Sequence, residues 1–313
     1  MAEKETGKRF ALVTGAFSGI GKATASLLRA RGFIVFAGLL DEAQHRALAS
    51  EGDETGRIIP LVLDITDEAS IAAARARVEE RTGGAGLDAL VNNAGIALAG
   101  PIEFLPLALI RRQLEVNLIG HIAVTQAFAS MIRKRKGRII NIGSVSCRVS
   151  NLFLSPYAMS KHALKAWNDS LRMELRRWGI GVSLIEPGNV STSIWTAAFA
   201  EIDRLAASMP PEGTRLYGQM ISTMKASMAG RLSKTLAPED VAAKVLAAIE
   251  SRRPRAFYPV GMDRRVKVAL AMILRPHAYD RFIWKYLGLD SLPPPDEVSV
   301  SGIPAPSPGG GLP

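Results

Sequence analysis

The sequence is poor in cysteine and in long apolar runs, and both absences narrow the kind of protein it encodes. The single cysteine, Cys147, excludes an intrachain disulfide and fits a reducing compartment. No apolar run approaches the ~20 residues that span a bilayer, and the N-terminus lacks the apolar core of a secretory signal. No spacing of metal-ligating residues stands out. We therefore expect a cytoplasmic protein without disulfides and without a metal site.

Negative charge is also in short supply. The chain has 39 Lys and Arg against 29 Asp and Glu, and residues 231–290 supply +6 of the net charge of +10, from 12 basic and 6 acidic residues. Such a surface could attract nucleic acid, anionic lipid or an anionic cofactor. Because no zinc-finger spacing, helix-turn-helix or RNP-like aromatic motif accompanies the charge, we expect no nucleic-acid partner. A solvated basic surface is the simplest interpretation.

What the sequence has is a regular alternation of apolar strands and amphipathic helices. Hydrophobic residues make up 48% of it, enough for a sizeable core in one large domain. The predicted strands are Phe10–Thr14, Phe33–Leu39, Ile58–Leu63, Leu87–Asn92, Gly137–Gly143, Gly181–Ile185 and Arg255–Pro259. The predicted helices are Gly19–Arg31, Asp41–Ser50, Thr66–Arg81, Leu107–Arg133, Pro156–Trp178 and Pro238–Ser251. This order predicts an α/β fold with a Rossmann-type, doubly wound parallel sheet.

A glycine-rich turn, T-G-A-F-S-G-I-G at residues 14–21, stands between the first strand and the first helix. Glycines there permit a tight turn and a close approach to a pyrophosphate, whose charge the helix N-terminus favours. The alternative is a turn that merely needs glycine. Asp64, at the end of the third strand, could bind an adenine amino group or cap a helix. Small residues in N-N-A-G at 92–95 would let the backbone line the same cleft.

Tyr157 and Lys161 stand four residues apart on the predicted helix 156–178, and so share one face of it. A nearby cation stabilises a phenolate, so we expect the ammonium to lower the pKa of the phenol. The pair would then be a device for proton transfer. Taken alone, the spacing also fits two unrelated helix positions.

In order and spacing, the motifs resemble the short-chain dehydrogenase/reductase family across about residues 8–260. The matching elements are T-G-x-x-x-G-I-G at 14–21, N-N-A-G at 92–95, Asn117 in E-V-N-L, Ser144, Y-x-x-x-K at 157–161 and P-G at 187–188. The segments V-F-A-G-L-L and R-I-I-N-I-G-S-V-S-C-R-V look like the branch with retinol, hydroxysteroid and 3-hydroxybutyrate dehydrogenases.

The resemblance implies a site that holds a nicotinamide cofactor beside four catalytic residues. Tyr157 would be the general acid or base, Ser144 would bind the substrate oxygen, and Lys161 would hold the ribose. Asn117 would position a water that links Lys161 to solvent. The implied cofactor-binding residues are Gly15, Phe17, Ser18, Gly19, Ile20, Gly21, Asp64, Ile65, Asn93, Ala94, Gly95, Tyr157, Lys161, Pro187, Gly188, Val190 and Thr192.

The choice between NAD and NADP depends on the end of the second strand. In the family, an acidic residue there favours NAD, and a basic residue there or in the glycine turn favours NADP. The expected acidic position is Gly38, no Lys or Arg follows it directly, and Ser18 is not basic. Asp41 could reach the ribose or cap a helix. These residues lean towards NAD.

The extent of the resemblance and the composition of the rest divide the chain into a core domain with extensions. The divisions are an N-terminal tail at 1–7, a dinucleotide-binding and catalytic domain at 8–260 with a substrate lid at 193–235, a basic amphipathic extension at 261–290 and a disordered tail at 291–313. Apolar and Met-rich, the lid suggests a hydrophobic substrate, although its methionines could instead be ordinary core. Residues 262–289 could lie on a membrane surface or pack on the domain or a partner subunit.

We therefore expect an NAD(P)-dependent oxidoreductase that transfers a hydride between nicotinamide and a hydrophobic secondary alcohol or ketone, or a retinoid-like alcohol. One alternative is a 3-oxoacyl-carrier-protein reductase, whose acidic carrier would meet the basic surface. A second alternative is a non-catalytic, cofactor-binding regulatory protein. The resemblance also implies a homo-oligomer.

Overall fold

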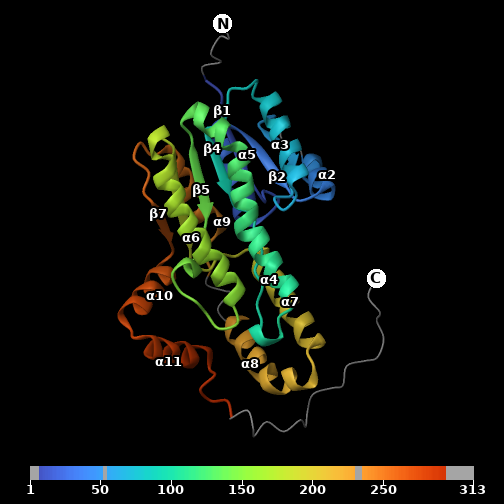
Figure 1. The fold of residues 1–313 in the computed structure, drawn as a ribbon, viewed down its shortest axis with the longest axis vertical. Coiled ribbons are helices and arrows are strands. Elements are labelled where there is room, and N and C mark those ends of the chain that lie inside the picture. Colours follow the sequence, from blue (N-terminus) through green and yellow to red (C-terminus); the bar gives the residue numbers. More distant parts are fainter. Residues whose placement is uncertain (1–6, 52–54, 230–234, 294–313) are drawn as a thin grey trace.

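Seven parallel strands form one sheet at the centre of the computed structural model, which describes residues 7–51, 55–229 and 235–293 (Figure 1). The strands are β1 (Arg9–Val13), β2 (Phe33–Leu39), β3 (Ile58–Val62), β4 (Ala89–Asn92), β5 (Arg138–Ile142), β6 (Gly181–Pro187) and β7 (Phe257–Val260). Their order is β3-β2-β1-β4-β5-β6-β7, so the winding reverses between β1 and β4. The predicted doubly wound α/β fold is confirmed.

Helices cover both faces of this sheet. Their bounds are α1 (Gly19–Ala30), α2 (Glu42–Glu51), α3 (Glu68–Arg81), α4 (Leu107–Leu114), α5 (Gly120–Arg135), α6 (Ser155–Leu175), α7 (Ser193–Ser208), α8 (Pro211–Ala229), α9 (Pro238–Glu250), α10 (Met262–Ile273) and α11 (Pro276–Leu287). Short helical turns are η1 (Ile102–Phe104), η2 (Glu115–Ile119), η3 (Val145–Cys147) and η4 (Arg176–Trp178).

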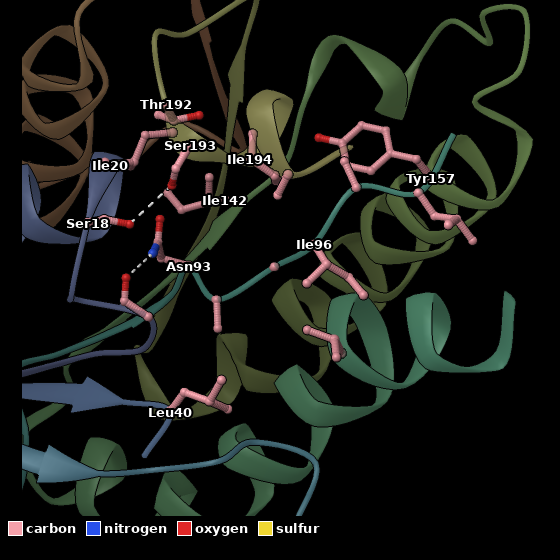
Figure 2. Close-up of a pocket in the computed structure, with 18 of the residues that line it drawn as sticks. Ser18, Ile20, Leu40, Asn93, Ile96, Ile142, Tyr157, Thr192, Ser193 and Ile194 are labelled. Carbon is pink, nitrogen blue, oxygen red and sulfur yellow. Dashed lines mark hydrogen bonds between the residues drawn. The ribbon is translucent and has the colours of Figure 1, made fainter. Parts of the chain in front are cut away.

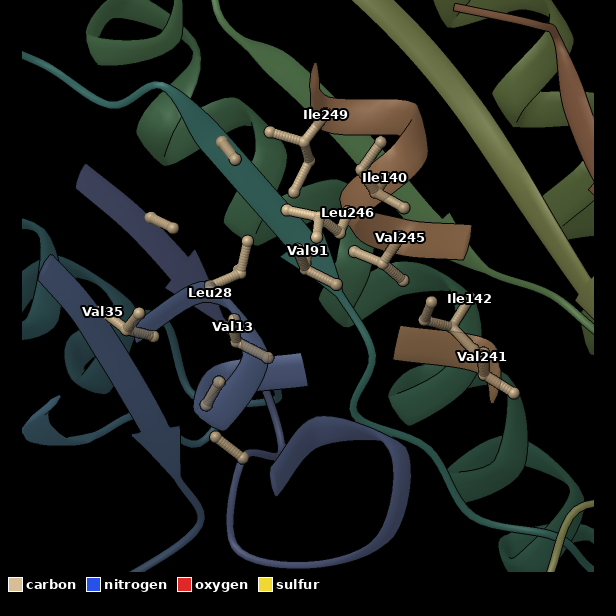
Figure 3. Close-up of a cluster of buried hydrophobic side chains, with 14 of the residues drawn as sticks. Val13, Leu28, Val35, Val91, Ile140, Ile142, Val241, Val245, Leu246 and Ile249 are labelled. Carbon is tan, nitrogen blue, oxygen red and sulfur yellow. The ribbon is translucent and has the colours of Figure 1, made fainter. Parts of the chain in front are cut away.

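The strands are apolar along their whole length because side chains of both orientations are buried. In β1, Ala11 and Val13 join the core beneath α1 and α9, where Leu28 and Val245 also lie (Figure 3). Leu12 points the other way, into the core that α3, α5 and α6 complete. Alternate residues of a strand face opposite sides of the sheet, which makes each strand part of two cores.

The helices α7 and α8 of the predicted lid enclose a third core together with the loop after β4. It includes Ile202 of α7, Ile221 and Met224 of α8, and Met209 between the two helices. The alternative interpretation of these two methionines, as ordinary core, is therefore the one that the structure supports. Residues 230–234 of the predicted lid, residues 1–6 of the N-terminal tail and residues 294–313 of the C-terminal tail lie outside the described residues.

Several predicted boundaries need correction. The helix predicted to run continuously over 107–133 is interrupted by the π turn η2. Thr66, the predicted first residue of the third helix, instead donates its hydroxyl to Asp64. Asp67 caps α3, its carboxylate accepting from the Ala69 N–H at 2.9 Å. The stretch 262–289 is two helices, since Pro276 has no N–H with which to continue the first one.

Candidate active site

A cleft of about 860 Å³ opens at the carboxyl ends of the strands, where the winding of the sheet reverses (Figure 2). This is where ligands bind in open parallel sheets. All of the predicted catalytic and cofactor-binding residues line it except Gly21 and Asn117. Residues from six separate stretches of the sequence therefore meet around one space.

The turn between β1 and α1 is shaped to receive an anionic group. Gly15 and Gly19 have φ angles of +63° and +52°, which disfavour other residues. The side chain of Ser18, which precedes α1, does not cap the helix, and the first turn holds no acidic residue. The N-terminal amides of α1 and its positive dipole end thus face the cleft without a side-chain anion. The pyrophosphate of a dinucleotide fits this cradle.

Gly21 supports the turn from below. A Cβ built on it would lie 2.1 Å from the Gly15 carbonyl oxygen and 2.6 Å from Nδ2 of Asn93. Because no side chain fits there, Gly21 lets α1 pack directly against the turn. The amide of Asn93 completes the arrangement by donating to the carbonyls of Thr14 and Gly15, at 2.9 and 3.1 Å.

Thr14 joins the two loops that flank the switch point, a role that sequence reasoning missed. Its buried hydroxyl accepts hydrogen bonds from the backbone N–H groups of Asn93 and Ala94, at 2.9 and 3.0 Å. The signal in the sequence was its place as the first residue of the glycine-rich turn. Leu40 was missed as well; it follows β2, is 53% exposed and lines the cleft.

The predicted proton-transfer pair lies on one side of α6, as the spacing requires. Tyr157 and Lys161 are both buried, and the lysine Nζ lies 5.8 Å from the centre of the tyrosine ring. That Nζ donates to the carbonyl of Ile142 at the end of β5, at 2.9 Å. Figure 2 shows the Tyr157 hydroxyl directed into the cleft, on the side where Ile194 lies. The two groups therefore reach the same space from one helix.

The electrostatics of the pair differ from the expectation. Burial raises the pKa of Tyr157 to about 12, and a hydrogen bond with Ser144 opposes this only in part. Burial also lowers the pKa of Lys161 to about 8. The expectation that the ammonium lowers the pKa of the phenol is wrong for this structure, because removal of the phenolate from water outweighs the other influences.

Asn117 lies behind the cleft, where it holds together two segments that line it. It is fully buried in η2, and its side-chain oxygen accepts from the Ile96 N–H at 2.9 Å. Its amide nitrogen donates to the Ile96 carbonyl at 2.9 Å and to the Ser160 hydroxyl at 3.1 Å. One side chain thereby ties the loop after β4 to α6, next to Lys161.

Beyond Tyr157 the cleft has an apolar wall. Trp195 of α7 lies against Tyr157, with ring centres 6.1 Å apart. Apolar residues of the loop after β4, of α4 and of α7 also line the space: Ile96, Ala97, Leu98, Leu109, Ile194 and Ala197. Of the predicted lid, the α7 half lines the cleft, whereas α8 packs behind α7 in the third core.

The family model for short chain dehydrogenases matches residues 9–203 of this chain. The chain is 32% identical over 284 residues to NADPH-dependent 3-dehydrocapnine reductase of Ornithobacterium rhinotracheale, covering 89% of this chain and 97% of that one. It is 35% identical over 260 residues to 17-beta-hydroxysteroid dehydrogenase type 6 of Bos taurus, covering 82% and 81%.

Solved structures agree on the fold. A short-chain dehydrogenase from Streptomyces avermitilis superposes with a TM-score of 0.70 at 22% identity, over 92% of this chain and 99% of that one. Actinorhodin polyketide ketoreductase with NADPH superposes with a TM-score of 0.66 at 28% identity, over 84% and 97%. The chain belongs to the short-chain dehydrogenase/reductase family, a family of NAD(P)-dependent oxidoreductases.

Proposed function

We propose that this enzyme interconverts a hydrophobic secondary alcohol and its ketone, or a retinoid-like alcohol and its carbonyl form, with Tyr157 as the general acid or base. The observation that carries the proposal is the position of the Tyr157 hydroxyl. It points into the cleft between a dinucleotide-shaped turn and an apolar wall. A carbonyl held by that wall would meet the phenol.

Each polar group of the proposed site has a chemical task. The Ser144 hydroxyl would bind the substrate oxygen and stabilise the charge that develops on it. With a pKa of about 12, Tyr157 is protonated at neutral pH and ready to donate, as carbonyl reduction requires. Lys161, held near the phenol by the Ile142 carbonyl, would contact the cofactor ribose. NAD(P), when bound, supplies or accepts the hydride.

The apolar wall supports a bulky, hydrophobic substrate. A cleft lined by Leu, Ile, Ala and Trp side chains gains little from a small polar molecule but stabilises a large apolar one. Similar chains have names that fit this class, among them retinol dehydrogenase 16 of Mus musculus, which is 33% identical over 263 residues.

For the cofactor, we propose weak discrimination with a slight preference for NAD. Asp41, which could have bound a ribose hydroxyl, caps α2 by accepting from the Gln44 N–H at 2.8 Å. Leu40 lines the cleft in its place. Neither Ser18 nor the segment from Gly38 to Gln44 brings a cation to a 2′-phosphate. The site thus has neither of the groups that select one nucleotide strongly.

The alternatives have less support. A 3-ketoacyl-(acyl-carrier-protein) reductase from Brucella melitensis superposes with a TM-score of 0.66, but at 23% identity the likeness concerns the fold alone. A non-catalytic regulatory protein would have no use for a buried phenol and ammonium directed at the cofactor cleft, since burying both groups disfavours their charged forms.

We also propose a homo-oligomer that forms through α5 and α6. These helices cover one face of the sheet (Figure 1), and Ile119, Met159 and Met173 are 45%, 45% and 63% exposed on or beside them. Large apolar side chains at the surface of neighbouring helices are typical of subunit contacts.

The test is a substrate screen followed by a conservative substitution. Steroids, retinoids and medium-chain alcohols and ketones are offered with each nicotinamide cofactor, and absorbance of the reduced nicotinamide is recorded. On the best substrate we expect Tyr157→Phe to lower kcat by at least ~100-fold, because general acid–base catalysis contributes that much. Binding of NADH or NADPH, measured by fluorescence, should not change.

Tyr258→Phe is the matched control, since Tyr258 lies in β7 and does not line the cleft. If Tyr157→Phe turned over a true substrate as fast as the wild type, the proposed mechanism would be wrong.

A further inference from the structure

The most exposed apolar side chains of the described part of the chain are gathered on α10. Met272, Ile273 and Met262 are 82%, 80% and 69% exposed, and no other large apolar residue that the structure describes exceeds these values. Val266, on the same helix, is 53% exposed. Single exposed apolar residues are ordinary, but four within twelve positions form a patch.

The patch has helical order. Met262, Val266 and Ile273 are separated by four and seven residues, which places them along one face of α10. Met272 lies beside this row. The helix therefore shows solvent an apolar stripe, where an ordinary surface helix would show a polar face.

The second extension helix, α11, adds exposed aromatic rings. Phe282, Trp284 and Tyr286 are 39%, 42% and 40% exposed, and the rings of Phe282 and Tyr286 are stacked with centres 5.9 Å apart. Trp and Tyr combine an apolar body with a polar tip, which suits them to the boundary between lipid and water.

Both helices lie at the outer edge of the molecule, beyond the last strand of the sheet (Figure 1). α10 contacts β7 and η3, and α11 contacts α8 of the lid. These contacts fix the pair to the body of the protein while the apolar side chains named above stay exposed.

Positive charge accompanies the apolar surface. Residues 262–289 hold six Lys and Arg but only two Asp. Lys267, Arg275, Arg281 and Lys285 form no ion pair with any residue in the described ranges 7–51, 55–229 and 235–293. Arg275, Arg281 and Lys285 are also exposed. Their charge is free to meet an anionic surface.

We propose that α10 and α11 dock this enzyme on the surface of an anionic lipid bilayer. The apolar stripe and the aromatic rings would enter the boundary of the acyl chains, and the cations would meet the lipid phosphates. Among the described residues, no helix combines the length and the apolar character needed to cross a bilayer, so the contact is with its surface. A second copy of the chain fits this face poorly, because it would oppose like charges.

The test is flotation of the full-length protein with vesicles of neutral phosphatidylcholine or with about 30% anionic phosphatidylglycerol. We expect binding to the anionic vesicles, weakened by raising the salt from about 0.1 to 0.5 M. No binding, or equal binding to both vesicles without a salt effect, would overturn the proposal with the wild-type protein alone.

Two pairs of matched variants locate the surface. Met272→Ser with Ile273→Ser should lower vesicle binding about tenfold or more, whereas Ile102→Ser with Leu107→Ser, also highly exposed, should not. Arg281→Glu with Lys285→Glu should lower vesicle binding in the same way, whereas Arg46→Glu with Lys244→Glu, which also changes two exposed cations that form no ion pair with the described residues, should not. The docking surface would be refuted if the variants of α10 and α11 bound vesicles as well as the wild type does. It would also be refuted if these variants had a lower molecular mass in solution than the wild type, since this face would then join two copies of the chain. Unchanged circular dichroism and cofactor binding verify the fold of each variant.

Discussion

His121 is a buried titratable residue that the proposed mechanism does not use. It lies on α5, one turn beyond Asn117, and is inaccessible to solvent. Burial lowers its pKa from 6.5 to about 3, the charge of Lys161 acts in the same direction, and the Ala94 backbone opposes both in part. The imidazole is therefore neutral in the folded enzyme at any pH at which the enzyme would work.

This shift predicts a loss of stability in acid. Below pH 6.5 the unfolded chain binds a proton at His121 that the folded chain takes up only near pH 3, so acid favours unfolding across that window. Between pH 7 and pH 5 this amounts to about 2 kcal/mol of unfolding free energy. His121→Leu should remove that part of the decline in urea titrations at the two pH values.

His277→Leu serves as the control, because that imidazole is 96% exposed and folding does not remove it from water. If the wild type and His121→Leu lost equal stability between pH 7 and pH 5, His121 would not be the group responsible.

For single residues, the sequence was a better guide to which residues form the candidate site than to the surroundings of each side chain. Gly15, Ser144 and Tyr157 could be placed from motif order alone, since the chemistry needs those residue types there. The roles of Thr14 and Gly21 could not be predicted, because each depends on a contact with the loop after β4, more than 70 residues away in the sequence. The direction of the Tyr157 pKa shift also needed the burial that only the fold provides.

Among the elements, α7 is the one that we propose selects the substrate. It begins at Ser193, beside the glycine turn, and carries Trp195 against Tyr157. Behind it, α8 is held by a hydrogen bond from Tyr217 to Glu103, at 2.8 Å. The substrate wall is thus one helix supported by another.

If α7 forms the substrate wall, a substitution in it should weaken substrate binding without weakening cofactor binding. Trp195→Ala removes the ring that packs on Tyr157, and we expect KM for a hydrophobic substrate to rise about tenfold, the value of one aromatic contact. Affinity for the reduced cofactor, measured by fluorescence, should stay within about twofold. Trp178→Ala, in η4 away from the cleft, is the control. Equal losses of both affinities in a folded Trp195→Ala variant would contradict the assignment of α7 to the substrate.

The sequence was enough to predict which helices and strands exist, but it predicted less well where the helices end and where they are interrupted. Strand β2 was predicted to the residue, because apolar residues fill it and a glycine precedes it. The interruption at η2 was not, since the sequence 107–133 has no proline or glycine pair where the π turn forms. Asn117 occupies this turn, and its bonds to Ile96 and Ser160 are tertiary contacts that no local pattern announces.

For the whole molecule, the alternation of strands and helices was enough to predict the sheet, because parallel strands need crossover helices. The placement of α10 and α11 was not predictable, as their periodicity fits a helix packed on the domain equally well. The exposed fractions of their apolar side chains, which only the structure gives, are the observation on which the proposed membrane contact rests.

If the proposed oligomer forms through α6, a substitution on α6 should change the molecular mass of the protein in solution. Met173→Glu introduces a charge at the proposed contact, and we expect the dissociation constant of the assembly to rise about 100-fold above that of the wild type. Light scattering after size exclusion measures the change. Met262→Glu, at similar exposure on α10, should leave the mass unchanged. A monomeric wild type, or the reverse pattern of the two variants, would exclude α6 as the interface.

The hydroxyls of Ser18 and Ser193 lie 3.5 Å apart, and a Cβ on Gly19 would come within 3.0 Å of Thr192. The start of α7 therefore rests on the turn that is shaped for the pyrophosphate. A ligand that orders the glycine turn therefore lowers the free energy needed to order the start of α7, and the reverse also holds, because such coupling is reciprocal. We therefore expect a bound nucleotide to raise the affinity of the cleft for the second reactant, and a bound second reactant to raise the affinity for the nucleotide by the same factor.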